Sequence, residues 1–195
     1  MRRAGLPRAR ARSGRYLPRA EFRYLGGWNF HTLRPLLGGG WIAEDDARHR
    51  YESRDGSDFT VVSGAFGIGN GLVVPRFVLQ VSPTLFTFRI SFMNRAGSRI
   101  RVVGYTPVDG RLFKHGITEY RYADTEQRFR LRMADRVVTA TFEPDGTGTI
   151  RIDDKSNPTV KIREFTDIPV GGNWMRVPRF GQWADLADPD YRAAR

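Results

Sequence analysis

The stretch TLFTFRISF, residues 84–92, is the clearest secondary-structure signal in the chain. Successive side chains of a β-strand point to opposite faces, so the pattern places the apolar residues on one face and Thr, Arg and Ser on the other. A strand that is apolar on one face only is typical of an antiparallel sheet that covers a core. We therefore predict a chain built around antiparallel β-structure.

Similar short segments recur along the chain and are separated by turn signals. Asp109-Gly110 and Asp145-Gly146 suit tight hairpins, because Asp and Gly tolerate the positive φ angles that such turns require. Glycine-rich sequence between 22 and 49 disfavours a long helix, and Glu44-Asp45-Asp46 is interpreted as a solvated turn. We expect about ten strands and no core helix. Besides 84–92, the expected strands are 41–43, 51–52, 59–62, 99–105, 112–122, 127–133, 137–143, 147–153 and 159–165.

Consecutive hairpins of this kind favour a sheet that closes on itself. The first choice is an all-β, up-and-down barrel, because closure removes exposed strand edges. The alternative is a β-sandwich or jelly roll. The alternating pattern shows which face of a strand each side chain occupies, but it does not show which strands pair with each other. At 195 residues, with 40% hydrophobic and 12% aromatic residues, the chain fits one domain with a real core. This domain is expected over 21–195, after a tail at 1–20.

Gly39-Gly40-Trp41 opens one of the expected strands and precedes the long meander. This arrangement resembles the glycine-x-tryptophan start of the calycins, the lipocalin and fatty-acid-binding group of β-barrels. The resemblance covers residues 38–166 at the level of architecture. It implies a barrel with an internal pocket and supplies no family-specific site residue.

The formal net charge of +11 is unevenly distributed. Residues 1–23 hold eight Arg against Glu21, whereas residues 24–195 carry only +4. The tail alternates Arg with Ala, Gly and Pro and has no apolar periodicity, so we expect it to be disordered. It is interpreted either as a solvated extension or as an arm that neutralises phosphates or an anionic surface. The charge of the body alone implies no polyanion partner.

The absence of cysteine excludes disulfides, thiol nucleophiles and cysteine-based metal sites. The chain has no apolar run of about 18 residues and no secretory signal, so a soluble, cytoplasmic protein is expected. His31, His49 and His115 are far apart in the sequence, and no metal site is predicted from them. A haem group needs only one histidine, so the identity of any cofactor stays open.

The segment from Gly64 to Gly71 superficially resembles a phosphate-binding glycine loop. Such loops open a helix whose N-terminus faces the phosphates, whereas residues 72–77 are expected to continue as extended chain. Nucleotide binding is therefore not expected there. A flap over a barrel mouth and a plain strand connection are the two remaining interpretations.

The strand from His115 to Tyr122 carries the candidate catalytic groups. By the two-residue period, His115 and Glu119 share one face, while Tyr120 and Tyr122 share the other. In a partly polar cavity, His115 or Glu119 could exchange a proton and Tyr120 could hydrogen-bond a ligand. The alternative is an exposed row of Glu119 and Arg121, with the tyrosines packed in the core.

Three functions are compatible with these patterns. The first is binding of a small apolar or aromatic molecule in a barrel pocket. The second is a small-molecule enzyme, such as a cyclase, isomerase or lyase of secondary metabolism, with proton transfer by His115 or Glu119. The third is a structural or nucleic-acid-associated protein that uses the basic arm. The candidate ligand-binding residues are Trp41, Phe86, Phe88, Tyr120 and Tyr122.

Overall fold

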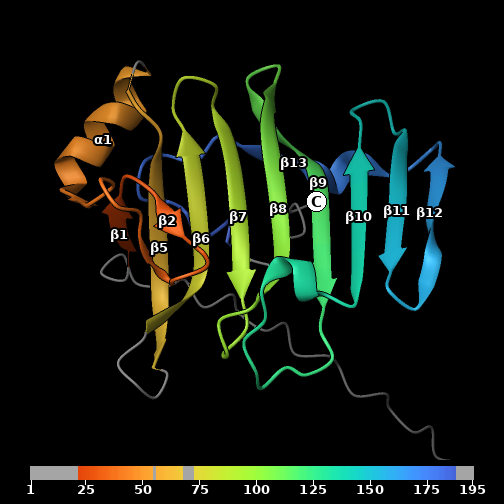
Figure 1. The fold of residues 1–195 in the computed structure, drawn as a ribbon. Helices are drawn as coiled ribbons and strands as arrows, with labels where there is room; N and C mark the ends of the chain where they lie inside the picture. Colours follow the sequence, from red (N-terminus) through yellow and green to blue (C-terminus); the bar gives the residue numbers. More distant parts are fainter. Residues whose placement is uncertain (1–21, 55, 68–72, 188–195) are drawn as a thin grey trace, which may run out of the picture.

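The computed structural model describes residues 22–54, 56–67 and 73–187, so the expected tail at 1–20 lies outside the described residues. Eleven strands form one sheet, and two short strands form a separate hairpin (Figure 1). The strands are β1 (Phe22–Leu25), β2 (Trp28–Asn29), β3 (Arg34–Pro35), β4 (Trp41–Ile42), β5 (Phe59–Gly67), β6 (Val73–Ser82), β7 (Thr87–Met93), β8 (Arg99–Val108), β9 (Arg111–Arg121), β10 (Arg136–Phe142), β11 (Gly148–Asp154), β12 (Asn157–Phe165) and β13 (Trp174–Arg176). The helices are α1 (Glu44–Ser53) and the 3-10 helices η2 (Leu131–Met133) and η3 (Val170–Asn173).

The large sheet is an antiparallel meander, which confirms the main prediction from the alternating pattern. From β12 back to β5, each strand pairs with its neighbour in sequence, and β1 and β4 then continue the sheet beyond β5. In the described part of the chain no pairing joins β12 to β4, so the expected closure into a barrel is not found. The two-residue β4 offers few backbone groups with which the nine-residue β12 could pair.

One face of the sheet, called the inner face here, is covered by α1 and by residues 177–187. In Figure 1 this C-terminal segment runs behind the sheet. Trp183 is fully buried, with its ring centroid 5.3 Å from that of Tyr51 and 5.5 Å from that of Phe180. The inner-face residues Phe59 and Phe88 complete this aromatic cluster. Burial of these rings stabilises the fold by about 25 cal/mol for each Å² of apolar surface removed from water.

The helix α1 corrects the prediction of a solvated turn followed by a strand at 51–52. Its first turn is acidic and its last turn contains a basic residue, an arrangement that the helix dipole favours. Arg48 lies one turn after Glu44, and its guanidinium is 3.0 Å from the Glu44 carboxylate. Ala47 and Tyr51, also four residues apart, are buried against the sheet. Ala47 and Tyr51 have helical spacing in the sequence, but the glycine-rich sequence around them led to the prediction that no long helix forms there.

The prediction of a strand at 127–133 is also wrong, because these residues form a loop that ends in η2. The Phe129 backbone N–H donates to the Ser98 hydroxyl oxygen at 2.8 Å instead of to a neighbouring strand. The Phe129 ring stacks on Tyr122, with ring centroids 5.5 Å apart. The Arg128 guanidinium donates to two backbone carbonyl oxygens in the turn after β2. The alternating side chains of this segment thus pack a loop against the sheet, and they do not form a strand.

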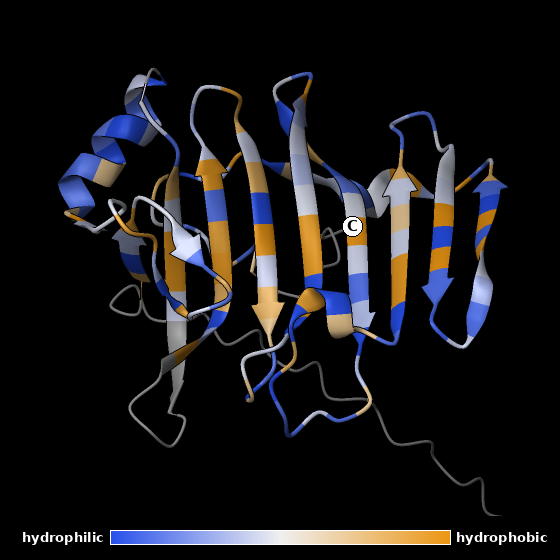
Figure 2. Ribbon diagram, viewed as in Figure 1, coloured by the Kyte–Doolittle hydropathy of each residue, from blue (hydrophilic) through white to orange (hydrophobic). Residues whose placement is uncertain are grey.

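The opposite, outer face of the sheet is covered only in part. There the β2–β3 segment lies in front of β5 and β6 and packs Trp28 and Phe30 against Val62 and Val78 (Figure 1). Figure 2 shows alternating hydrophilic and hydrophobic bands along β11 and β12, at the other end of the sheet. Gly148 is the only buried residue of β10, β11 and β12. Among the described residues, no helix is long and apolar enough to cross a membrane.

Candidate functional site

A groove of about 720 Å³ lies on the outer face of the sheet. Its floor includes residues that pair across neighbouring strands: Thr60 with Gln80, Gln80 with Arg89, and Arg89 with Gly104. Directly opposed residues of antiparallel strands point to the same face, so these positions face the groove together. One wall comes from the segment around β2 and β3, through Gly26, Gly27 and Leu36. The volume is typical of a small-molecule site.

Hydroxyl groups extend the polar floor toward β10. Thr118 of β9 and Thr139 of β10 are directly paired, and their side-chain oxygens are 3.3 Å apart. Thr141, the next outward-facing residue of β10, also lines the groove. These hydroxyls can donate or accept, so the floor can adapt to either kind of ligand group.

A β-bulge places His115 in the groove. The register of β8 and β9 shifts between Gly104 and Tyr105, which pair with Gly116 and Lys114, so His115 is the extra residue. A Cβ atom added to Gly104 would lie 2.7 Å from His115 Nε2. The imidazole therefore occupies the space that a side chain at position 104 would need, and the glycine makes room for it.

Because of this bulge, His115 and Glu119 lie on opposite faces of the sheet, and the prediction that they share a face is wrong. Glu119 pairs directly with Arg101, and its Oε1 atom is 3.8 Å from Arg101 Nε. Arg101 in turn pairs with Phe92, which belongs to the inner-face core. The two-residue period holds only for an unbroken strand, and the extra residue at 115 breaks it. Glu119 is thus separated from the groove by the sheet itself.

The groove combines a permanent cation with an imidazole. Partial burial lowers the pKa of His115; Glu143 acts in the opposite direction, and Arg89 lowers the pKa further. A histidine with a lowered pKa is neutral at pH 7, with one ring nitrogen as donor and the other as acceptor. Within the described residues, Arg89 forms no ion pair with a carboxylate. No ion pair neutralises its charge, although the Asp58 carboxylate lines the same groove.

The five predicted ligand-binding residues do not gather at one site. Phe88 lines the groove only as a member of the core, with 1% of its surface exposed. Phe86 lies in the turn before β7 with a φ of 50°, and its ring packs against Tyr51 of α1. Trp41 is on the edge strand β4 and is 58% exposed.

The two predicted tyrosines lie on the outer face but do not line the groove. Tyr120 pairs with Val137 of β10. The Tyr122 hydroxyl donates to the Arg99 carbonyl oxygen at 2.8 Å, which gives it a structural role. The sequence analysis missed Arg89 and Gln80 as site residues. Arg89 was recognisable as the one charged residue on the polar face of the stretch 84–92.

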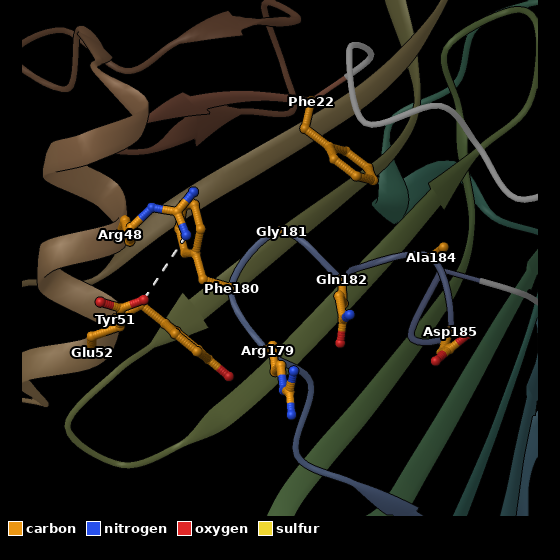
Figure 3. A pocket seen from close by; sticks show the side chains of 10 residues that line it. All are labelled: Phe22, Arg48, Tyr51, Glu52, Arg179, Phe180, Gly181, Gln182, Ala184 and Asp185. Carbon is orange, nitrogen blue, oxygen red and sulfur yellow. Dashed lines mark ion pairs between the residues drawn. The ribbon is translucent and has the colours of Figure 1, made fainter.

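A second cavity of about 720 Å³ lies between α1 and the C-terminal segment (Figure 3). Two of its polar side chains, Arg48 and Tyr51, join the helix to the C-terminal segment. The Arg48 guanidinium lies 4.6 Å from the centre of the Phe180 ring and is 3.9 Å from the Glu52 carboxylate. The Tyr51 hydroxyl donates to the Pro178 carbonyl oxygen. This cavity is therefore interpreted as a structural seam.

The remaining candidates from the sequence form no site in the described part of the chain. His31 lies in the turn after β2 and His49 in α1, both on the surface. No group of three His, Asp or Glu residues that could hold a metal ion occurs among the described residues. Of the glycine-rich segment, residues 64–67 belong to β5, and residues 68–71 lie outside the described residues.

No family model matches the chain, and comparisons with curated proteins and with solved structures gave no match either.

Proposed function

We propose that the outer-face groove binds a small molecule that carries a carboxylate or phosphate group. The observation that carries this proposal is the position of Arg89, whose charge has no carboxylate partner among the described residues, in the same groove as His115. A guanidinium group can donate two parallel hydrogen bonds to a carboxylate or phosphate. The neutral imidazole adds a further donor or acceptor beside it.

The rest of the groove suits a ligand with an apolar body. Leu36 forms part of the wall and is 47% exposed, so contact with a ligand would remove apolar surface from water. Val102 and Gly104 lie on the floor beside the polar residues. A small aromatic or aliphatic acid meets both requirements, with its anionic end at Arg89 and its body toward Leu36.

Native mass spectrometry of the full chain, purified from cells under gentle conditions, tests for a retained ligand. Calorimetric titration with benzoate and phenyl phosphate then tests the anion requirement with defined probes. We expect Arg89→Gln to weaken binding about tenfold or more, because a charge-assisted hydrogen bond is lost. Arg163→Gln, an exposed arginine on the inner face of β12, is the matched control. Equal affinities for both variants, or no adduct and no binding, would refute the proposal.

The lowered pKa of His115 favours a second candidate, an enzyme in which the imidazole accepts a proton from the bound molecule. Glu143 is the carboxylate that raises the pKa of His115, whereas Glu119 pairs with Arg101 on the other face of the sheet. For a ligand identified by mass spectrometry, His115→Gln should abolish turnover while Kd changes little. If the wild-type protein leaves the ligand unchanged after prolonged incubation, the groove is a binding site only.

A further inference from the structure

We propose that the loop Leu36–Trp41, called the apolar loop here, docks the protein on an anionic lipid bilayer. The loop shares Leu36 with the wall of the groove, whereas Leu37 and Trp41 do not line the groove. Three large apolar side chains of the loop are exposed: Leu36 by 47%, Trp41 by 58% and Leu37 completely, at 105%. Three large exposed apolar side chains in one short segment are unusual for a surface that contacts only water.

The shape of the loop favours a bilayer over a protein partner. Gly38 has a φ of 82°, and a Cβ atom added to Gly38 or Gly40 would meet nothing within 4 Å. Leu37 and Gly38 therefore project into solvent, whereas Gly39 packs against Gly26 and Gly27 at the base of the loop. A convex apolar tip needs a matching pocket in a protein, whereas acyl chains adapt to its shape. Trp41 beside the tip fits the preference of tryptophan for the boundary between headgroups and acyl chains.

Two arginines lie close to the base of the loop. The Arg23 guanidinium carbon lies 5.7 Å from the centre of the Trp41 ring, and Arg34 is exposed on β3. The strand β1, which pairs with β4, begins directly after residues 1–21, where most of the chain's +11 charge lies. Each basic residue near an anionic surface adds to the attraction. The chain therefore prefers anionic over neutral lipid.

Three carboxylates follow the loop and limit this attraction. Glu44 is paired with Arg48, but Asp45 and Asp46 at the start of α1 are exposed. Local charges near the tip thus partly cancel, and insertion of Leu36 and Leu37 has to supply part of the binding. The proposal requires both contributions, apolar and electrostatic, and the experiment separates them.

The test uses the full chain with vesicles of phosphatidylcholine, with and without phosphatidylglycerol, in a co-sedimentation assay. We expect binding to the anionic vesicles, weakening with salt. Leu37→Asp should weaken it about tenfold or more, because a leucine that would insert into the bilayer is replaced by a charge. The control is Ile162→Asp, an exposed residue on β12 at the opposite end of the sheet, which should bind like the wild type. Unchanged thermal unfolding of both variants shows that they fold.

Tryptophan fluorescence reports insertion directly. Trp41 is the only one of the four tryptophans that is exposed, so vesicles should shift its emission to the blue, and Trp41→Phe should remove that shift. No sedimentation with either vesicle overturns the proposal. Salt-sensitive binding that Leu37→Asp leaves unchanged also overturns it, since arginine charge alone would then explain the binding. Loss of self-association in Leu37→Asp without any vesicle binding would assign the loop to a second copy of the chain instead.

Discussion

The Tyr51 hydroxyl donates a hydrogen bond to the carbonyl oxygen of Pro178 at 2.6 Å, which joins α1 to the C-terminal segment. The two residues are 127 positions apart in the chain. Tyr51 is 5% exposed, and its ring meets Trp183 edge-on. The two segments that cover the inner face therefore contact each other as well as the sheet.

Replacing Tyr51 with Phe should lower the free energy of unfolding by roughly 1–3 kcal/mol at pH 7. The loss comes from the partly buried Pro178 carbonyl group, which is left without its donor, while the ring packing is retained. Urea-induced unfolding measures the change. Tyr120→Phe, for which no hydrogen bond of the hydroxyl is found among the described residues, should stay within about 0.5 kcal/mol of the wild type. Equal losses for both variants would contradict the assigned role of the hydrogen bond.

Stability should decline in alkali partly because of the same hydroxyl. Burial raises the pKa of Tyr51 from 10.0 to about 12, although Arg54 acts in the opposite direction. The folded-state pKa lies above the unfolded one, so this contribution is complete below pH 10 and is lost as the pH rises from 10 to 12. The free energy of unfolding, measured across this range, should fall less steeply in Tyr51→Phe than in the wild type. Parallel profiles would show that Tyr51 is not protected from ionisation.

Trp183→Ala should cost about 3–5 kcal/mol, because a fully buried indole is removed from the aromatic cluster. The matched variant is Trp41→Ala, at a position that is 58% exposed, which should change stability by about 0.5 kcal/mol or less. Thermal and urea unfolding of the two variants provide the comparison. A small effect at Trp183 would mean that the C-terminal segment does not seal the core in solution.

Gly148→Ala should destabilise the protein strongly, since a Cβ atom there would clash with the backbone carbonyl oxygen of Thr141. Backbone cannot move aside as a flexible side chain can, so β10 and β11 would have to separate locally. Gly171→Ala is the control, because a Cβ atom at that position meets nothing within 4 Å. Unfolding free energies should differ by more than about 1 kcal/mol between the two variants. Equal stability would contradict the observed register of β10 and β11.

The pKa of His115 should respond to its two charged neighbours in opposite directions. Arg89→Gln should raise it by removing a nearby positive charge, and Glu143→Gln should lower it by removing a negative one. Titration of the imidazole signals by NMR measures both shifts, with His115→Gln used for assignment. An Arg89→Gln variant with an unchanged His115 pKa would show that the two side chains do not share the groove.

The sequence was sufficient to predict the antiparallel meander and the inward-facing residues of β7. Phe88 and Ile90 are almost fully buried, as the alternating pattern requires, while Arg89 between them is exposed. Asp109-Gly110 forms the expected tight turn, with both φ angles positive. These features depend on neighbours in the chain, which is why a one-dimensional pattern contains them.

The candidate site needed the tertiary structure. His115 enters the groove because of a bulge opposite Gly104, and no two-residue period can reveal an inserted residue before the pairing of β8 and β9 is known. Arg89 faces the groove together with Gln80 and Gly104, which belong to the strands on either side of β7. The alternation at 127–133 misled because Ser98, distant in sequence, binds the Phe129 backbone.

By itself, then, the amino-acid sequence determined most strands of the meander, its tight turns and which side chains of β7 avoid water. Only the tertiary structure decided which strands lie side by side, that the described strands form an open sheet, and that α1 and Trp183 cover one face while the other carries the groove. The physical reason is that alternation records how each residue meets water, whereas pairing and covering depend on contacts between segments that the chain brings together from a distance.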